Sequence, residues 1–407
     1  MSAQVCFYFQ IHQPWRLRDY RHADVGLRHD YFDDAANAAI VRRVAHKCYL
    51  PMCALLGEAI AAHAPHLRLS FSVSGCALQQ LQRWAPEVLR ALRALHASGQ
   101  VEWLGETSHH TLAALYDSHE FAQQVRLQRR LCTRLLGPAG RVLRNTELIA
   151  SDAVIAQAAA LGATHLLLEG AEGWLGARTP LAAYRCAAAP QVLALPRAYR
   201  LSDDIAFRFS DRNWPCWPLR ASQYADWLQA AAQGSGIAAP MIGLFMDFET
   251  FGEHQWADSG IFEFMRALPG EVLRRGLAFA TPGRIGAASL GEGPCELPRP
   301  YSWADQERDV SAWRGNAIQQ EALQRIYALG ARLRALPAGV AGNALREDWR
   351  RLQTSDHFYY MATKHWSDGE VHKYFSPFES PYDAYVVWMH ALDDLQWRLQ
   401  RLERGTD

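Results

Sequence analysis

The stretch Met241-Ile242-Gly243-Leu244-Phe245-Met246-Asp247-Phe248-Glu249 is an apolar run that ends in two carboxylates. An uninterrupted apolar run of this length is typical of a buried strand in a parallel sheet. Carboxylates at the end of such a strand are costly to bury unless they are paired or hydrogen-bonded. Asp247 is therefore a candidate functional residue at a strand end.

A second motif has the same design earlier in the chain, where Val142-Leu143 leads into Arg144-Asn145-Thr146-Glu147. Two carboxylates brought together from distant parts of a chain are the minimum apparatus for breaking a glycosidic bond. Like charges in close contact push their pKa values apart, so that one group is ionised and the other protonated near neutral pH. The alternative is that Glu147 caps the following helix and that backbone amides bind Asp247. The occurrence of two such carboxylates, Glu147 and Asp247, favours an enzymatic function.

The first two-thirds of the chain alternates short apolar runs with helical patterns such as 87–95 and 153–161, which indicates parallel βα units. Polar residues follow at least four of the runs, and the carboxyl ends of barrel strands all open onto one face. An open doubly wound sheet would gather such residues only near its switch point. We therefore expect a barrel, with strands in 5–11, 67–73, 101–104, the run into Arg144, 164–168 and 241–246, and with 206–209 as a further strand or an antiparallel insertion.

The character of the sequence changes after about residue 290. Residues 286–300 are rich in Gly, Pro and Ser and predict a linker or surface crossing. Beyond them we expect a helix from Asn316 to Leu336, a second around Trp349, and a third that begins at Ser380-Pro381. The predicted organisation is a catalytic barrel over 1–290 and a C-terminal helical bundle over 291–407 that contributes to the active site.

The composition favours a neutral ligand. Lys+Arg and Asp+Glu are both 42, so no global charge would attract nucleic acid or an anionic membrane, whereas a sugar fits. The start carries no signal-peptide pattern, and no apolar stretch approaches a membrane span. The eight cysteines are scattered without a C-x-x-C pair, which favours reduced core thiols. We therefore expect a cytoplasmic protein, without a cofactor, and leave its oligomeric state open.

Histidines and aromatic residues supply further candidates for the site. His12 follows the first strand, and its imidazole could hydrogen-bond sugar hydroxyls. His109-His110 raises the possibility of a metal, but adjacent histidines on an extended chain point apart and no H-E-x-x-H is present, so we expect none. Residues 252–260 predict a polar loop beside Asp247. The patch over 355–369 is more often core than ligand site, but it could lean over the barrel mouth.

These residues resemble glycoside hydrolase family 57, whose members are retaining α-glucan enzymes with an incomplete (β/α)7 barrel and a helical C-terminal region. Five short regions of that family have counterparts in order along this chain. They are His12-Gln13-Pro14, the stretch 99–110, Arg144-Asn145-Thr146-Glu147-Leu148, Met246-Asp247-Phe248-Glu249-Thr250-Phe251-Gly252, and the stretch 355–369. The third and fourth regions are most similar to the α-amylase-type subgroup.

The resemblance implies that Glu147 is the nucleophile, Asp247 the acid/base, and α-1,4-glucan such as glycogen or malto-oligosaccharide the substrate. Around this pair we expect substrate contacts from His12, Gln13, Trp103, Glu106, His110, Arg144, Phe248, Glu249, His254, Asp356 and Trp366. One departure concerns the second region, which reads Glu106-Thr107-Ser108-His109-His110 where subgroup members usually carry aromatic residues before the last histidine. The loss of a ring there bears on substrate preference.

Three alternatives stay open on the sequence alone. A transglycosylase would use the same carboxylates and pass the glycosyl unit to another sugar. A metal-dependent polysaccharide deacetylase would use Asp152, His109 and His110 as ligands. A non-catalytic glucan-binding protein would use the aromatic patches and keep the acids for structure.

Overall fold

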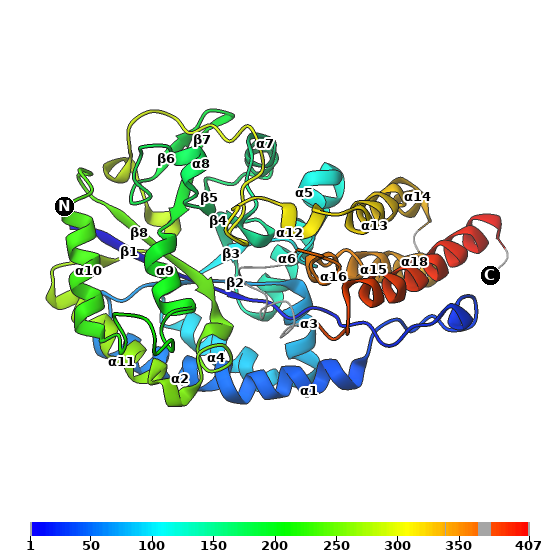
Figure 1. The fold of residues 1–407 in the computed structure, drawn as a ribbon, viewed down its shortest axis with the longest axis horizontal. Helices are drawn as coiled ribbons and strands as arrows, with labels where there is room; N and C mark the ends of the chain where they lie inside the picture. The colour runs from blue at the N-terminus through cyan, green and yellow to red at the C-terminus, as the bar shows by residue number, and fades with distance from the viewer. Residues whose placement is uncertain (1, 338, 365–375, 406–407) are drawn as a thin grey trace.

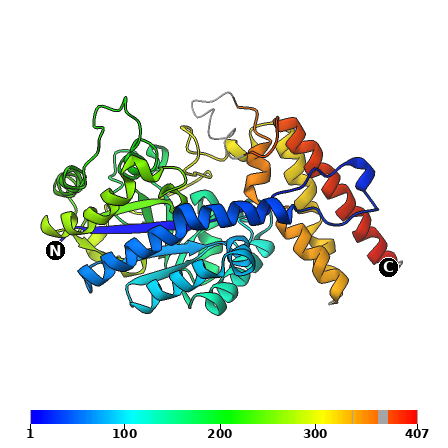
Figure 2. The ribbon, with the colours of Figure 1, turned by 90° about the horizontal axis from the view of Figure 1, so that it is seen from below.

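A computed structural model of the chain describes residues 2–337, 339–364 and 376–405. Figure 1 shows a sheet wrapped by helices over the first part of the chain, with the C-terminal helices gathered on one side. Figure 2 shows that the long N-terminal helices run beneath the sheet toward those C-terminal helices.

Seven parallel strands close into a barrel. The order around the ring is β1-β2-β3-β4-β5-β7-β8, and β1 closes it because it pairs with both β2 and β8. The predicted barrel fold is therefore confirmed. The strands are β1 Gln4–Ile11, β2 Leu69–Val73, β3 Val101–Gly105, β4 Ala139–Arg144, β5 His165–Glu169, β7 Ala189–Arg197 and β8 Met241–Asp247. Two short strands lie outside the ring: β6 Tyr184–Cys186, antiparallel to β7, and β9 Ala278–Phe279, beside the start of β1.

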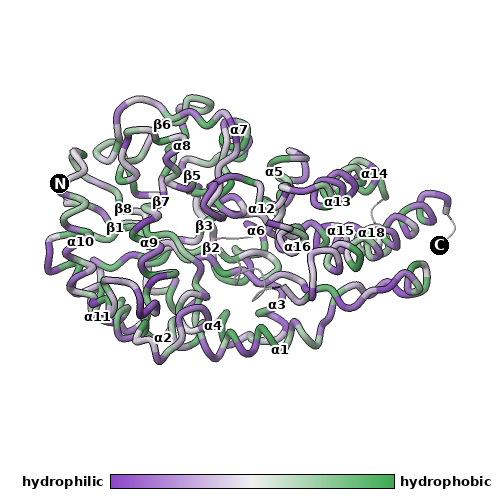
Figure 3. Tube along the Cα trace, viewed as in Figure 1, coloured by the Kyte–Doolittle hydropathy of each residue, from purple (hydrophilic) through white to green (hydrophobic). Residues whose placement is uncertain are grey.

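Several helices around the barrel begin at a side chain that caps them. Ser74, Asp117 and Ser151 each accept a hydrogen bond from a backbone N–H in the first turn of the helix that follows. Apolar and polar residues alternate along these helices (Figure 3), and the apolar ones are buried against the sheet. The larger helices are α1 Asp34–Val44, α2 Leu50–His63, α3 Gly75–Trp84, α4 Pro86–Ala97, α6 Ser118–Leu135, α7 Asp152–Ala160, α9 Tyr199–Ala206, α10 Ala221–Gln233 and α11 Ile261–Arg274.

The C-terminal helices share a core with one side of the barrel. Trp349 and Trp388 belong to the same buried cluster as Phe121 of α6 and Leu143 of β4. None of the helices in the described ranges has the length and hydropathy needed to cross a bilayer. The predicted division at residue 290 stays a prediction. The helices are α12 Ser311–Arg314, α13 Ala317–Ala328, α14 Gly330–Ala335, α15 Val340–Arg351, α16 Ser355–Tyr360 and α18 Pro381–Arg404.

Two local predictions were wrong. Residues 206–209 form no strand, because the N–H groups of Phe207 and Arg208 donate to the Asp203 carbonyl and close the end of α9 as a turn. The helix predicted from Asn316 to Leu336 is interrupted, since α13 ends at Ala328 and α14 begins at Gly330. The caps at Asn316 and Ser380 are confirmed, because each side chain accepts a backbone N–H from the first turn.

A buried carboxylate joins α18 to the loop that leaves β1. Asp394 is fully buried and accepts hydrogen bonds from the Gly26 N–H at 2.6 Å, the Tyr31 hydroxyl at 2.6 Å and His29 Nδ1 at 2.8 Å. The three donors belong to the N-terminal part of the chain, so this one carboxylate connects segments from the two ends of the sequence.

Replacing Asp394 with alanine should lower the free energy of unfolding by about 3 kcal/mol, because three donors, among them the buried Tyr31 hydroxyl, lose their acceptor. Denaturation in urea, followed by circular dichroism, measures this change. The neighbouring Asp393 is the matched control: it is 41% exposed and paired with Arg325, so its replacement should cost at most about 1 kcal/mol. Equal losses in the two variants would contradict the role given to Asp394.

Candidate active site

Glu147 stands just past the carboxyl end of β4 in a strained turn. Its backbone has φ 56° and ψ 28°, a left-handed conformation that is uncommon outside glycine. The Asn145 side chain donates to the Ile149 carbonyl at 2.9 Å and holds this turn closed. The following helix α7 is capped by Ser151. Glu147 therefore does not serve as the cap that was considered as an alternative.

Three donors from three parts of the chain bind the Glu147 carboxylate. His110 Nε2 lies 3.0 Å from Oε1, the Ser355 hydroxyl donates to Oε1 at 3.4 Å, and the Trp303 indole N–H donates to Oε2 at 2.6 Å. Burial alone would raise the pKa of Glu147, but the bond and charge of His110, with Arg144 and Trp303, outweigh it and leave the pKa below its usual value. Glu147 is therefore ionised at neutral pH.

Asp247 ends β8 and lies in register with Gln10 of β1. Burial and the negative charge of Glu147 together raise the pKa of Asp247 to about 6, against the opposing charge of Arg144. None of the described residues hydrogen-bonds to its carboxyl group. The two carboxylates thus interact electrostatically across the barrel mouth, with one ionised and the other close to its titration point.

His110 links Glu147 to a second, fully buried carboxylate. Its Nδ1 faces the Gln10 amide at 3.2 Å and Glu106 Oε2 at 3.6 Å, while Nε2 faces Glu147. Burial alone would lower the pKa of His110, but its bonds with Glu106 and Glu147 overcome that effect and raise the pKa to about 9. The ring is therefore a cation between two anions.

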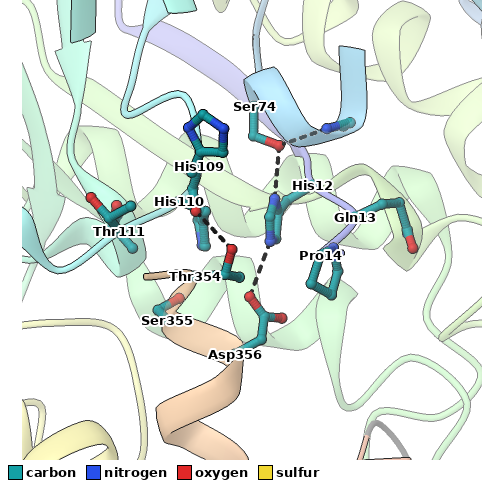
Figure 4. Close-up of polar contacts among 12 residues, drawn as sticks. His12, Gln13, Pro14, Ser74, His109, His110, Thr111, Thr354, Ser355 and Asp356 are labelled. Atoms are coloured by element: carbon teal, nitrogen blue, oxygen red, sulfur yellow. Dashed lines mark hydrogen bonds and ion pairs between the residues drawn. The ribbon is translucent and has the colours of Figure 1, made fainter. Parts of the chain in front are cut away.

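His12 lies face to face with His110, their ring centroids 4.0 Å apart. Burial lowers the pKa of His12, and the charge of His110 lowers it further, so this second ring is neutral near pH 7. Figure 4 shows the resulting chain: Ser74 at the start of α3 bonds to His12 Nδ1 at 2.7 Å, and His12 Nε2 bonds to Asp356 of α16 at 3.0 Å.

The C-terminal region hydrogen-bonds to the backbone of the adjacent residues His109 and His110. The Thr354 hydroxyl donates to the His109 carbonyl at 3.0 Å, and the Ser355 N–H donates to the His110 carbonyl at 2.9 Å (Figure 4). Burial would raise the pKa of Asp356, but His12, His110 and His357 hold it well below its usual range. Helix α16 therefore presents an ionised carboxylate to the barrel mouth.

Glu249 is a further acid at this end of the barrel. It accepts hydrogen bonds from the Tyr49 hydroxyl and, at 3.4 Å, from the Gln13 amide. Burial raises the pKa of Glu249 to about 8, with a further contribution from the charge of Asp247. Glu249 is therefore mostly protonated at neutral pH and able to donate a hydrogen bond.

Arg144 carries a buried guanidinium into the same region. It is fully buried, and none of its three nitrogens has a hydrogen-bond partner among the described residues. The guanidinium lies over the Trp303 ring, 4.9 Å from its centroid, and its charge lowers the pKa of both Glu147 and Asp247. Its unused donors are suited to polar groups of a ligand.

Some residues predicted to bind substrate lie elsewhere. Trp103 is 1% exposed and packs against Phe71 and His96 in the core outside the barrel. Phe248 is fully buried in the same core, because the side chains of β8 and the turn after it alternate between the barrel interior and the helices. Burial lowers the pKa of His254 to about 4, so this histidine is neutral. Trp366 lies outside the described residues.

Sequence reasoning missed several residues that contact the acids or the histidines beside them. Ser355 stood directly before the predicted Asp356, and Ser74 follows a recognised strand, so strand-end position could have found them. Trp303 gave no local signal, since it lies beyond the predicted linker in no strand or helix. Arg197 ends β7, a strand that was not predicted, because prolines at 190 and 196 interrupt its apolar pattern.

The ligand set of the deacetylase alternative is not brought together. His109 bonds to Gln124 at 3.1 Å and faces Glu347 at 3.3 Å, while His110 faces Glu147. Asp152 accepts the Leu297 N–H at 3.0 Å. Among the described residues, no group of three or more His, Cys, Asp or Glu is arranged to hold a metal ion.

Comparison with known proteins agrees with this arrangement. The sequence model of Glycosyl hydrolase family 57 matches residues 6–286. A protein of Methanocaldococcus jannaschii named "Putative alpha-amylase" is 35% identical over 407 residues, 98% of this chain and 85% of that protein. Among solved structures, a branching enzyme from Thermococcus kodakaraensis matches with a TM-score of 0.70 at 14% identity, covering 100% of this chain and 92% of its own. An α-amylase from Thermotoga maritima matches at 0.65 and 10%, covering 100% and 95%.

The barrel and the sequence match together define a glycoside hydrolase. The chain belongs to glycosyl hydrolase family 57, as the five sequence regions predicted. The two solved structures, at these low identities, support the fold alone.

The charge of His110 provides a direct test of the site. Replacing Glu147 with glutamine removes an anion from its Nε2, so the pKa of His110 should fall from about 9 by at least about one unit. NMR titration of the imidazole measures it. Replacing Glu347, which faces His109 instead, is the control and should leave His110 unchanged. A His110 pKa that is the same in wild type and Glu147→Gln would contradict the ion pair.

Proposed function

We propose that this chain is a retaining α-glucan hydrolase of the α-amylase type, with Glu147 as nucleophile and Asp247 as acid/base. The observation that carries this proposal is the placement of Glu147 just past the end of β4, bonded to His110 and Trp303, and of Asp247 at the end of β8. In this setting the pKa of Glu147 is lowered and that of Asp247 is raised to about 6. A nucleophile must be ionised and a general acid must hold its proton near the working pH.

In the first step a Glu147 oxygen attacks the anomeric carbon while the bond from that carbon to the leaving oxygen breaks. Asp247 gives its proton to the leaving oxygen, and a covalent glycosyl-enzyme forms. In the second step the Asp247 carboxylate takes a proton from water, the water oxygen attacks the anomeric carbon, and Glu147 is released. Two inversions at the same carbon retain its configuration.

The hydrogen bonds of Glu147 indicate which of its oxygens attacks. Each carboxylate oxygen has two acceptor positions. Oε1 receives both His110 and Ser355, whereas Oε2 receives Trp303. Oε2 therefore keeps a lone pair for the anomeric carbon, and His110 with Ser355 fix the other oxygen.

The surrounding groups suit the hydroxyls of a glucose ring. Asp356 and Glu106 are acceptors, and protonated Glu249 with the free nitrogens of Arg144 are donors. Removing such partners in a buried site costs binding strongly, which makes the hydroxyl pattern of the sugar a basis for specificity. We infer a malto-oligosaccharide or glycogen-like substrate and a cytoplasmic location.

The names of the relatives are compatible with two acceptors for the glycosyl group, water and another sugar. The relative that is 35% identical carries an α-amylase name, which favours water as acceptor, whereas a solved structure of the same fold is named a branching enzyme, a name that implies a sugar acceptor. Transglycosylation is therefore the second candidate, with an identical first step.

Incubation with a defined malto-oligosaccharide should give shorter products with new reducing ends in the α configuration, resolved by chromatography and NMR. Replacing Glu147 with glutamine should lower kcat by roughly 10⁴-fold or more, because the glycosyl-enzyme no longer forms. The exposed pair Arg200–Glu172 offers a control, since Glu172→Gln should keep full activity. New reducing ends that never accumulate would indicate transfer, and full activity in Glu147→Gln would contradict the proposal.

The pH dependence follows from the two carboxylates. kcat/KM should decline above pH about 6 as Asp247 loses the proton that it must donate. Because Glu147 raises the pKa of Asp247, Glu147→Gln should shift the Asp247 titration to lower pH, as measured by carboxyl-carbon NMR. A titration that moves upward, or not at all, would show that the two groups do not interact.

A further inference from the structure

The short segment from Tyr301 to Asp309 crosses the barrel mouth and reaches the proposed nucleophile. Tyr301 pairs with Ala150 through two backbone hydrogen bonds of 2.9 Å each, next to the turn that carries Glu147. The Trp303 N–H donates to the Glu147 carbonyl at 3.2 Å, and the Trp303 indole donates to its side chain. The segment is therefore attached to both the backbone and the carboxylate of Glu147.

Arg308 closes this segment into a loop. Its Nη1 donates to the Trp303 carbonyl at 2.7 Å, and its own carbonyl accepts the Ser302 N–H at 3.2 Å. The backbone of Arg308 has φ 50°, a left-handed conformation that a side chain seldom adopts without compensating contacts. These contacts tie the Arg308 guanidinium to the backbone of the residue that binds the nucleophile.

A buried group of charges holds the Arg308 side chain. Arg308 lies 3.4 Å from Asp203 Oδ2 and 3.6 Å from Glu169 Oε2, and its guanidinium lies over the Tyr199 ring at 4.7 Å. Arg197 pairs with the same two carboxylates, at 2.5 Å and 3.2 Å. Glu169 is fully buried, and it has two arginines to neutralise it. None of these residues contacts Glu147 directly, although the Arg197 guanidinium also lies over the Trp303 ring, 5.7 Å from its centroid.

We propose that Trp303 is a further catalytic residue, which holds Oε2 of the nucleophile, and that Arg308 is its positioning residue, anchored by Glu169 and Asp203. This inference rests on Glu147 being the nucleophile. The indole N–H stabilises the carboxylate in the free enzyme, and Arg308 sets the position of the indole by fixing the Trp303 backbone. Loosening either contact raises the pKa of Glu147 and turns Oε2 away from the anomeric carbon.

Four variants test the assignment: Trp303→Phe, Arg308→Ala, the double variant, and Arg299→Ala as control. Arg299 lies in the same part of the chain and also stacks on a ring, that of Tyr301 at 4.6 Å, but it is exposed and does not contact Trp303. The readouts are kcat and KM on a malto-oligosaccharide, together with the acid limb of the kcat/KM profile, which reports the pKa of Glu147 in the free enzyme.

Trp303→Phe and Arg308→Ala should each lower kcat by about tenfold or more, with a smaller change in KM, and each should move the acid limb to higher pH. In the Trp303→Phe background, Arg308→Ala should add no further shift of that limb, because its effect passes through the indole. Arg308→Lys should recover part of the kcat, and Arg299→Ala should match the wild type.

An acid limb that is unchanged in Arg308→Ala, or that shifts equally in the presence and absence of the indole, would overturn the positioning role. Circular dichroism and thermal melting identify variants that lose activity by unfolding, and Arg308→Lys then carries the test. The wild type separates this failure from that of the proposed function: an inactive wild type rejects the hydrolase, whereas an active wild type with unaffected variants rejects only the positioning role.

Discussion

The ion pair between His110 and Glu147 is the interaction on which the rest of the site depends. A carboxylate that is largely enclosed would normally take up a proton, and this one stays charged because a buried imidazolium lies 3.0 Å away. The imidazolium in turn persists because Glu106 faces its other nitrogen. The charges of Glu147 and His110 in turn shift the pKa values of neighbouring side chains.

Each of these charges shifts the pKa of the next ionisable group. His110 lowers the pKa of the stacked His12, which leaves a neutral ring between Ser74 and Asp356. The anion of Glu147 raises the pKa of Asp247, and the charge of Asp247 raises that of Glu249. Acids at the same end of the barrel thus hold different protonation states at a single pH, which is the condition for using one as nucleophile and another as proton donor.

The sequence could predict which polar residues lie at the ends of barrel strands. An apolar run followed by a carboxylate predicted that Glu147 and Asp247 lie at strand ends, and the closure of β1 against both β2 and β8 explains why the ends of β4 and β8 open onto the same end of the barrel. Trp303 and Arg308 could not be predicted, because their positions depend on tertiary contacts with Glu147 and with each other. Trp103 and Phe248 were misplaced for a related reason: aromatic residues beside a motif face the helices or the barrel interior according to register, which periodicity alone did not decide.

The left-handed backbone at Glu147 has a consequence for how this position is maintained. Glycine would adopt φ 56° without the steric penalty that a side chain incurs there, a difference of about 1 kcal/mol. Folding by itself would therefore favour the smaller residue, and the larger one persists against that preference. Glutamate at this position therefore carries backbone strain, which its hydrogen bonds with His110, Ser355 and Trp303 offset in the folded protein.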